Sequence, residues 1–293
     1  MACGMSTRPP PRILSIAGSD SSGGAGIQAD IKTITMLGGY AMTAITTVTA
    51  QNTLGVQAVV PMSGEVVLEQ MASCIEDIGV DAIKIGMLHD EDIIRHVAGG
   101  LVASPEVAAR SASGHARKNP PPGVERFPIV LDPVMIATSG AALIAPGAVE
   151  AMKARLFPLA TLITPNLPEL EHLCGRTLRT LDLMREGAAE LAGRYQCHVL
   201  AKGGHTGDAQ IIDLLVAPDG SAVTFEHARI ATRHTHGTGC TLSSAIATLL
   251  GHGQPLEHAV RLARQYVLRA IEAAPGFGLG SGPLGHQLVR RPG

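Results

Sequence analysis

Aromatic side chains are scarce in this sequence of 293 residues, which has no tryptophan, three tyrosines and four phenylalanines. Proteins that stack single-stranded nucleic acid need aromatic faces in series, and these seven are scattered. The 23 basic and 25 acidic side chains give a formal net charge of -2, so the chain has no basic excess to hold a phosphate polymer. We therefore expect no nucleic-acid partner, and any planar ligand would lie between aliphatic or methionine side chains.

Cysteine pairs are also lacking. No two of the five cysteines form a CxxC pair, and an odd, widely spaced set does not suggest a disulfide framework. They are Cys3, Cys74, Cys174, Cys197 and Cys240. Free thiols of this kind fit a reducing cytoplasm.

We expect neither a secretion signal nor a membrane span in this sequence. A signal peptide has an apolar segment after its positively charged start, and the N-terminal residues of this sequence have none. Residues 33–64 carry no charge, but Gln51, Asn52 and Pro61 interrupt them, so we interpret this stretch as buried soluble structure. No membrane partner is expected.

Short apolar runs rich in β-branched residues alternate with segments of helical period, which is typical of a parallel sheet covered by helices on both faces. The predicted strands are 13–17, 44–49, 57–61, 82–85, 129–131, 161–163 and 198–201. Residues 211–216 and 222–225 predict an antiparallel hairpin around Pro218, Asp219 and Gly220. Two closing helices are expected at 241–250 and 256–273.

One domain accounts for this rhythm, from residue 12 to residue 275. Residues 104–126 contain four prolines and no apolar period, and the strand–helix rhythm resumes unchanged after them. We interpret them as a surface insertion. Residues 1–11 and the Gly/Pro-rich tail, 276–293, are expected to be poorly ordered.

A glycine-rich loop, residues 18–26, joins the first predicted strand to the first helix. Its four glycines allow a ligand to approach the backbone at the carboxyl end of a strand, where open α/β sheets bind ligands. It is not a Walker A loop, because the required Lys and Ser/Thr do not follow. A structural turn with a helix cap is an equally good interpretation of this loop alone.

A second glycine-rich segment, residues 236–241, opens a predicted helix. Small residues there expose backbone N–H groups, and the helix dipole adds positive charge, so Gly237, Thr238 and Gly239 predict an anion-binding turn. The same field is expected to lower the pKa of the Cys240 thiol. The alternative is that Cys240 is a small buried hydrophobe, as most free cysteines are.

Two further segments follow predicted strands. Asn166 and Glu169 are three residues apart at a helix start, where their oxygens can face a hydrated Mg²⁺; Glu169 could instead cap the helix. Lys202, at a strand end before two glycines, is placed to meet a phosphate.

Asp132 ends a fourth strand, and an ordinary turn residue would explain it if it stood alone. Polar groups at several strand ends would instead share one rim of the sheet. The histidines, including His234 and His236, show no metal-ligand spacing and are interpreted as structural or surface residues.

The motifs together resemble the ribokinase-type small-molecule kinases, and most closely the hydroxymethylpyrimidine/phosphomethylpyrimidine kinase family of thiamine biosynthesis. The matching segments occur in the family's order and cover most of residues 12–274. They are 17–30, 84–88, 131–135, 164–169, 202–205 and 235–241.

This resemblance implies a three-layer α/β/α fold, ATP and Mg²⁺ as cofactors, and two successive phosphorylations. The first acts on the hydroxymethyl group of 4-amino-5-hydroxymethyl-2-methylpyrimidine and the second on its monophosphate. Carried over by motif, the pyrimidine pocket would be lined by Gly18, Asp30, Gln51, Met87 and Val134. The amide of Gln51 suits an aminopyrimidine because it offers both a donor and an acceptor.

The same resemblance assigns roles in phosphoryl transfer. Cys240 would accept the proton of the attacking hydroxyl, the amides of 237–240 and Lys202 would hold the transferring phosphate, and Asn166 with Glu169 would position Mg²⁺. Asp132 would join Lys202 and Asn166 at the ATP phosphates.

Two departures from the family pattern stand out. Thr138 replaces the usual Lys before Ser-Gly, which removes a cationic contact for a phosphorylated substrate, and the insertion 104–126 has no counterpart. Two alternative functions remain, a pyridoxal kinase and a non-catalytic binding protein that kept the fold.

A homodimer is expected, because exposed sheet edges in such folds are often covered by a second subunit.

Overall fold

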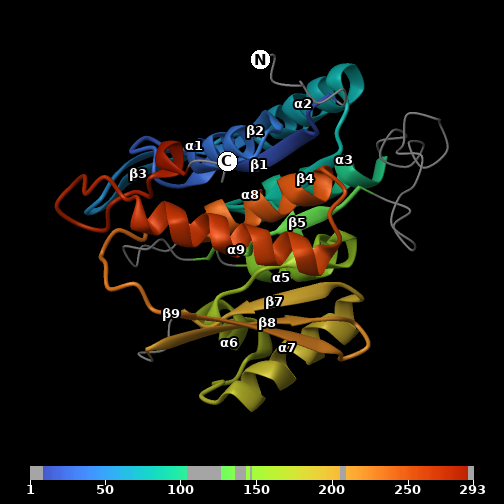
Figure 1. Ribbon diagram of the computed structural model, residues 1–293. Coiled ribbons are helices and arrows are strands. Elements are labelled where there is room, and N and C mark those ends of the chain that lie inside the picture. Colours follow the sequence, from blue (N-terminus) through green and yellow to red (C-terminus); the bar gives the residue numbers. More distant parts are fainter. Residues whose placement is uncertain (1–8, 104–126, 136–142, 146, 205–208, 290–293) are drawn as a thin grey trace.

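The computed structural model describes residues 9–103, 127–135, 143–145, 147–204 and 209–289. The predicted insertion 104–126, Thr138 and His205 lie outside this part. The strands form a nine-stranded sheet in the order β3-β2-β1-β4-β5-β6-β7-β8-β9. This sheet runs through the molecule (Figure 1).

The centre of the sheet is parallel, and both of its edges are antiparallel. The parallel strands are β1 (Arg12–Asp20), β2 (Tyr40–Asn52), β4 (Ala82–Ile85), β5 (Ile129–Leu131), β6 (Leu162–Ile163) and β7 (His198–Lys202). At one edge β3 (Gly55–Pro61) runs antiparallel to β2, and at the other the hairpin of β8 (Gln210–Val216) and β9 (Ala222–Ala228) runs antiparallel to β7. The mostly parallel sheet and the late hairpin are confirmed.

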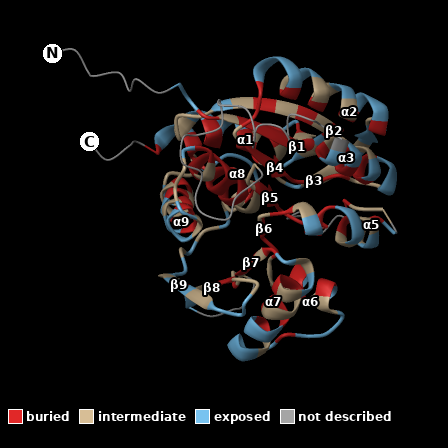
Figure 2. Ribbon diagram, turned by 90° about the vertical axis from the view of Figure 1, so that its right-hand side faces the viewer, coloured by how far each residue is buried: buried red, intermediate tan, exposed pale blue. Residues whose placement is uncertain are grey.

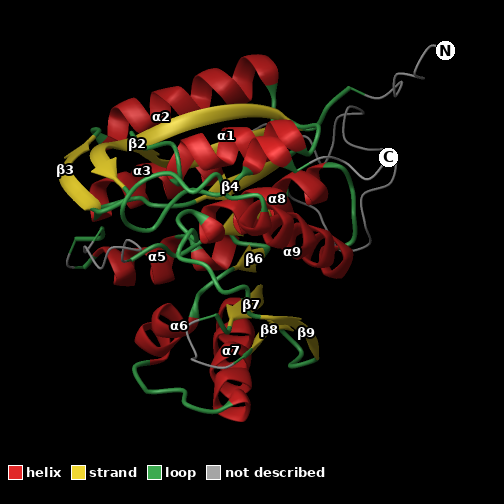
Figure 3. Cartoon of the chain, turned by 60° about the vertical axis from the view of Figure 1, so that its left-hand side comes forward, coloured by secondary structure: helices red, strands yellow, loops and turns green. Residues whose placement is uncertain are grey.

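Helices cover both faces of the sheet, because successive residues of each strand point to opposite sides. In β1, Ile13 packs with helices α1 (Gly26–Met36), α8 (Thr238–Gly251) and α9 (Leu256–Glu272). Its neighbour Leu14 belongs to the opposite cluster, which includes residues of the remaining helices. These are α2 (Gly64–Ser73), α3 (Glu91–Ala103), α5 (Ala148–Arg155), α6 (Leu167–Cys174) and α7 (Leu181–Tyr195). Three layers result (Figure 3).

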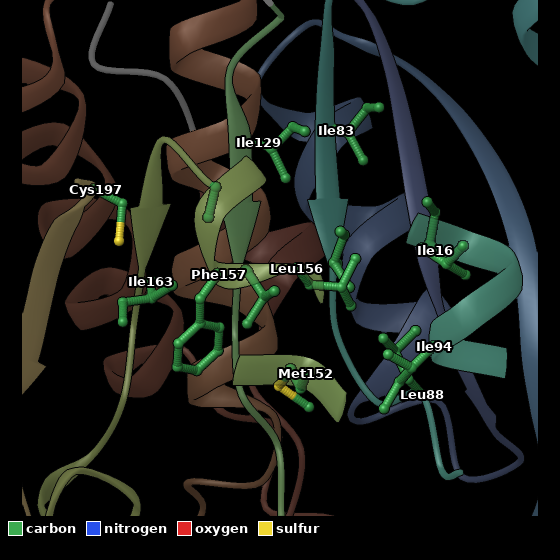
Figure 4. Close-up of a cluster of buried hydrophobic side chains, with 14 of the residues drawn as sticks. Ile16, Ile83, Leu88, Ile94, Ile129, Met152, Leu156, Phe157, Ile163 and Cys197 are labelled. Carbon is green, nitrogen blue, oxygen red and sulfur yellow. The ribbon is translucent and has the colours of Figure 1, made fainter. Parts of the chain in front are cut away.

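The larger of the two cores is filled mainly by aliphatic side chains, as the composition requires. Phe157, in a short 3₁₀ turn Phe157–Leu159, is fully buried near Met152 and Ile163 (Figure 4). Its ring meets that of Tyr195 edge to face, with centroids 5.1 Å apart. Burial is continuous along the central strands and falls off on the outer helix faces (Figure 2).

Helix α8 begins at Thr238, three residues before the predicted start, since Gly237 with φ +85° supplies the left-handed turn that opens it. The other closing helix is as expected, at Leu256–Glu272. A π-helical turn, Cys74–Ile78, extends α2.

The C-terminal tail was predicted to be poorly ordered, but in the structure it is packed and largely ordered. Residues 276–289 pack against the body of the protein and end in a short turn, His286–Leu288. Leu284 and His286 are buried, and His286 Nε2 lies 2.8 Å from the Thr241 hydroxyl in α8. The prediction weighed glycine and proline content and missed these two buried side chains. Within the described ranges, no helix combines the length and apolar character needed to cross a bilayer.

Candidate active site

A cavity of about 1440 Å³ lies at the carboxyl ends of the parallel strands and against the start of α8. Open α/β sheets bind ligands at this edge, and the volume exceeds what one small molecule needs. Twelve of the thirteen predicted site residues line it: Gly18, Gln51, Met87, Asp132, Val134, Asn166, Glu169, Lys202, Gly237, Thr238, Gly239 and Cys240. The chain therefore brings segments more than 200 residues apart to one hollow.

The two glycine-rich segments meet at one side of the cavity. A Cβ at Gly237 would lie 1.9 Å from the Gly24 carbonyl oxygen, and one at Gly24 would lie 2.3 Å from His236 Cδ2. Neither position has space for a side chain. The close approach fixes the start of α8 against the 18–26 loop, so the backbone of its first turn forms part of the cavity wall.

Lys202 and Asp132 form an ion pair at the other side of α8. The Lys202 ammonium lies 3.0 Å from Asp132 Oδ1, which also accepts the Thr164 hydroxyl at 2.8 Å. A Cβ at Gly239 would be 3.2 Å from Asp132 Oδ2 and 3.5 Å from Lys202 Nζ, so the pair directly faces the helix start. Burial lowers the pKa of Lys202, but Asp132 and Glu169 outweigh it and leave the pKa raised. The lysine therefore carries its charge into the cavity.

Asn166 and Glu169 form a reciprocal capping box at the start of α6. Asn166 Oδ1 accepts the Glu169 N–H at 2.9 Å, and Glu169 Oε2 accepts the Asn166 N–H at 2.8 Å. The capping alternative is thus what the side chains do, while both still line the cavity. Burial raises the pKa of Glu169 to about 7, against the opposing charge of Lys202.

The same two residues fit a hydrated Mg²⁺. Both are oxygen donors of the kind this ion prefers, but each already accepts a main-chain N–H, which favours contact through water. Among the described residues, no group of three or more His, Cys, Asp or Glu side chains is arranged to hold a metal ion. A cation here would depend on ligands from water and a bound phosphate.

The expectation for the Cys240 thiol is wrong in the structure. Cys240 lies in the first turn of α8 and lines the cavity, but burial raises the pKa of its thiol to about 11. The helix N-terminus was expected to lower this pKa, and desolvation is the stronger effect here. Lys84 is the main group that opposes the rise.

Asp30 also departs from its prediction, because it does not line the cavity. It lies on the buried face of α1, with no exposed surface, and its Oδ2 is 2.8 Å from the Lys84 ammonium of β4. The Ser15 and Ser244 hydroxyls donate to its two oxygens. A side chain enclosed in this way cannot touch a pyrimidine, so any influence on the site acts through Lys84.

His236 is buried in the cavity wall and is not a surface residue. Its Nε2 lies 2.8 Å from Asp20 Oδ2 and 3.3 Å from the Gln51 side-chain nitrogen. Asp20 Oδ2 also accepts the Ala25 N–H, and Oδ1 accepts the Ser22 N–H. Burial raises the pKa of Asp20, but the bonds from His236, Ser22 and Ala25 prevail and lower it to about 2. Asp20 and His236 thus join the two glycine-rich segments beside Gln51.

Sequence reasoning missed both His236–Asp20 and Lys84–Asp30 as pairs. One signal was available, since Lys84 stands in the middle of a predicted buried strand, where an unpaired lysine would be very costly. No comparable signal marks His236, whose partner is 216 residues away in the sequence.

Comparison with known proteins identifies relatives along nearly the whole chain. The sequence profile described as phosphomethylpyrimidine kinase matches residues 20–109 and 122–285. A hydroxymethylpyrimidine/phosphomethylpyrimidine kinase of Bacillus subtilis is 42% identical over 282 residues, covering 96% of each chain. The thiamine biosynthesis bifunctional protein ThiED of Geobacter sulfurreducens is 43% identical over 278 residues, and this chain covers 94% of its own length and 52% of that protein.

A solved structure agrees with this result. The pyridoxal kinase of Bacillus subtilis in complex with ADP superposes with a TM-score of 0.80 and 33% identity, over 95% of this chain and 98% of that one. The fold is therefore ribokinase-like, as the motifs implied. On the profile match and the identity to full-length relatives, the chain belongs to the phosphomethylpyrimidine kinase family.

Proposed function

We propose that this protein uses ATP to phosphorylate the hydroxymethyl group of 4-amino-5-hydroxymethyl-2-methylpyrimidine, and then the resulting monophosphate, for thiamine diphosphate biosynthesis. The observation that carries the proposal is the convergence of twelve motif residues on one cavity large enough for a nucleotide and a small ring. Family membership supplies the chemical class of the substrates.

The acceptor would lie beside Gly18, Gln51, Met87 and Val134. A Cβ at Gly18 would be 2.4 Å from the Thr47 hydroxyl oxygen and 3.3 Å from Met87 Sδ, so Thr47 leaves no space for a side chain at this position beside Met87. Met87 and Val134 can contact the two faces of a ring in a protein with few aromatics. The Gln51 amide would pair with the amino group and adjacent ring nitrogen.

Phosphoryl transfer needs alignment and neutralisation of charge. The hydroxyl oxygen bonds to the γ-phosphorus as the bond from that phosphorus to ADP breaks, and the hydroxyl proton passes to the Cys240 thiolate, which becomes the thiol. The amides of 237–240 hold the transferring oxygens, and Lys202 neutralises them beside Asp132. Asn166 and Glu169 would hold the water shell of Mg²⁺, which supplies positive charge at the ATP phosphates.

The deciding experiment is an ADP-release assay with MgATP and the hydroxymethylpyrimidine, followed by the same assay with its monophosphate. We expect turnover with both, and slower turnover of the monophosphate because Thr138 lacks the cationic group of the family's usual Lys. Folded protein with no turnover above background would end the proposal in favour of a binding protein.

Pyridoxal is the second candidate substrate, since the superposing structure is a pyridoxal kinase. Comparison of kcat/KM for the two acceptors separates the candidates, and a larger value for pyridoxal would reverse our assignment.

Gln51→Ala is expected to raise the pyrimidine KM roughly tenfold and to leave the ATP KM unchanged, because the mutation removes the side-chain amide that would pair with the acceptor. A selective rise in the ATP KM would contradict this placement of Gln51.

A homodimer is proposed as the assembly. The edge strand β3 and its turn expose apolar side chains, with Leu54 64% and Val60 59% accessible. Edge strands of this kind pair readily with another chain. Light scattering on the eluting protein tests this, and a monomer at micromolar concentration would exclude it.

A further inference from the structure

A completely buried ion pair lies at the wall of the cavity, which Lys84 lines and Asp30 does not reach. Lys84 and Asp30 are 2.8 Å apart, and neither side chain has any exposed surface. Lysine is among the residues least often fully buried, and a buried ion pair is seldom the most stable filling for a core. Apolar residues of the same volume would be no worse for stability, so the pair requires another explanation.

This pair is connected to Cys240 through one helix. Ser244, which donates to Asp30 Oδ1, comes four residues after Cys240 and therefore lies on the same face of α8. Lys84 and Cys240 border the same cavity, and the Gly26 N–H at the start of α1 donates to the Cys240 sulfur. The thiol thus lies at the N-terminal ends of two helices, beside a buried cation.

The Lys84 ammonium has three donors, and Asp30 is its one hydrogen-bond partner among the residues that the structure describes. A Cβ at Gly86 would lie 2.7 Å from Lys84 Nζ, so the glycine leaves space around the ammonium. Asp30 is held by two hydroxyls as well as by the lysine. The ammonium is therefore fixed in position but not saturated.

Four charged groups act on Cys240 from the surrounding elements. Lys84 of β4 and Lys202 of β7 favour the anion, while Asp30 of α1 and Asp132 after β5 disfavour it. Lys202 already pairs with Asp132 at the cavity. Lys84 is thus the cation that favours the Cys240 anion from the buried side of the cavity wall.

We propose that Lys84, held in place by Asp30, is a positioning residue that stabilises the thiolate of Cys240 relative to the thiol. The catalytic value of a stabilised thiolate rests on the proposed function, in which Cys240 accepts a proton. The stabilisation itself can be tested independently of that function, because the reactivity of the thiolate can be measured without turnover.

The test is the rate at which iodoacetamide alkylates Cys240 in the full-length protein at pH 8.5, resolved from other cysteines by peptide mass spectrometry. Lys84→Met is expected to slow the reaction roughly tenfold, and Asp30→Asn to accelerate it about threefold or more, since these changes remove opposite charges. The half-buried Cys74 serves as the internal reference and should not change.

Opposite changes in the two variants would support the proposal, because mere loosening of the core would accelerate alkylation in both. Equal signs, or no change beyond twofold in either, would overturn it. If either single variant fails to fold by circular dichroism, Lys84→Met/Asp30→Asn decides. We expect alkylation about threefold slower than in the wild type, because the expected slowing from Lys84→Met exceeds the expected acceleration from Asp30→Asn. An unchanged or faster rate, or failure of all three variants to fold, would leave the pair a purely structural role.

Discussion

Two lysine–aspartate pairs of nearly equal length flank the start of α8, and they differ in their surroundings. Lys84 and Asp30 have no exposed surface, whereas the Lys202 side chain is 15% exposed beside a nearly buried Asp132. A sealed pair cannot exchange partners, but an open one can direct its ammonium to an incoming phosphate. The same two residue types are therefore enclosed in the core in one place and accessible from the cavity in the other.

The largest difference is expected in stability. Lys84→Met leaves Asp30 buried and uncompensated, so the free energy of unfolding in urea should fall by about 3–5 kcal/mol. The control is Arg12→Met, which breaks a partly exposed pair with Asp81 and should lose no more than about 1 kcal/mol. Equal losses in the two variants would mean that burial of the Lys84–Asp30 pair does not increase the cost of removing its lysine.

The open pair should affect turnover instead. Lys202→Met removes the cation that faces the first turn of α8, and kcat should fall roughly 10²–10³-fold, measured by ADP release at saturating substrates. The free energy of unfolding of Lys202→Met should fall by less than that of Lys84→Met, which serves as the matched control. A kcat within threefold of the wild type would show that Lys202 does not meet the transferring phosphate.

Cys240 is close to both ion pairs, and its replacement tests whether their effects on turnover act through the thiol. Cys240→Ser should lower kcat by roughly 10²-fold through loss of the base. With a thiol pKa raised to about 11 and the thiolate as the active form, kcat/KM of the wild type should increase from pH 7 to pH 10. Steady-state rates across this range test both points, and the same slope in the serine variant would assign the pH dependence to another group.

Asp20 and His236 form a third pair, with side chains 4% and 7% exposed, and should give the smallest effect. The pKa of Asp20 is lowered to about 2 in the folded protein, so its contribution to stability is present above about pH 4 and is lost as pH falls through 2. Asp20→Asn should therefore cost about 2 kcal/mol at pH 7 and progressively less from pH 4 to pH 3. Urea unfolding at several pH values measures this, and a pH-independent loss would exclude the ionic explanation.

Much of the sheet was predictable, because local patterns determine it. Alternating or continuous apolar runs marked every strand, and polar residues and glycines at strand ends marked the cavity rim. The alternation that separates Ile13 from Leu14 also explains why helices cover both faces. Two of the helices, α5 and α7, were not predicted, whereas the start of α6 was expected at Asn166.

The pairings within the site were less accessible to sequence reasoning. Asp30 was assigned to the pocket by motif, but its position on the inner face of α1 turns it towards Lys84, 54 residues further along the chain. For Cys240, the helix dipole was foreseeable, whereas the depth of burial that outweighs it depends on how α1, β4 and α8 pack together. Long-range packing of this kind decides the ionisation of Cys240 and leaves no signal in the sequence around that residue.

The contact between Gly24 and Gly237 bears on how this protein can be re-engineered. Two main chains touch there with no room for a single methyl group, so the loops have matching shapes that neither can change alone. Chimeras that import one loop from a relative with different acceptor preference should misassemble unless the opposing loop is transplanted with it. The unit of exchange between such kinases is thus a pair of segments separated by some two hundred residues.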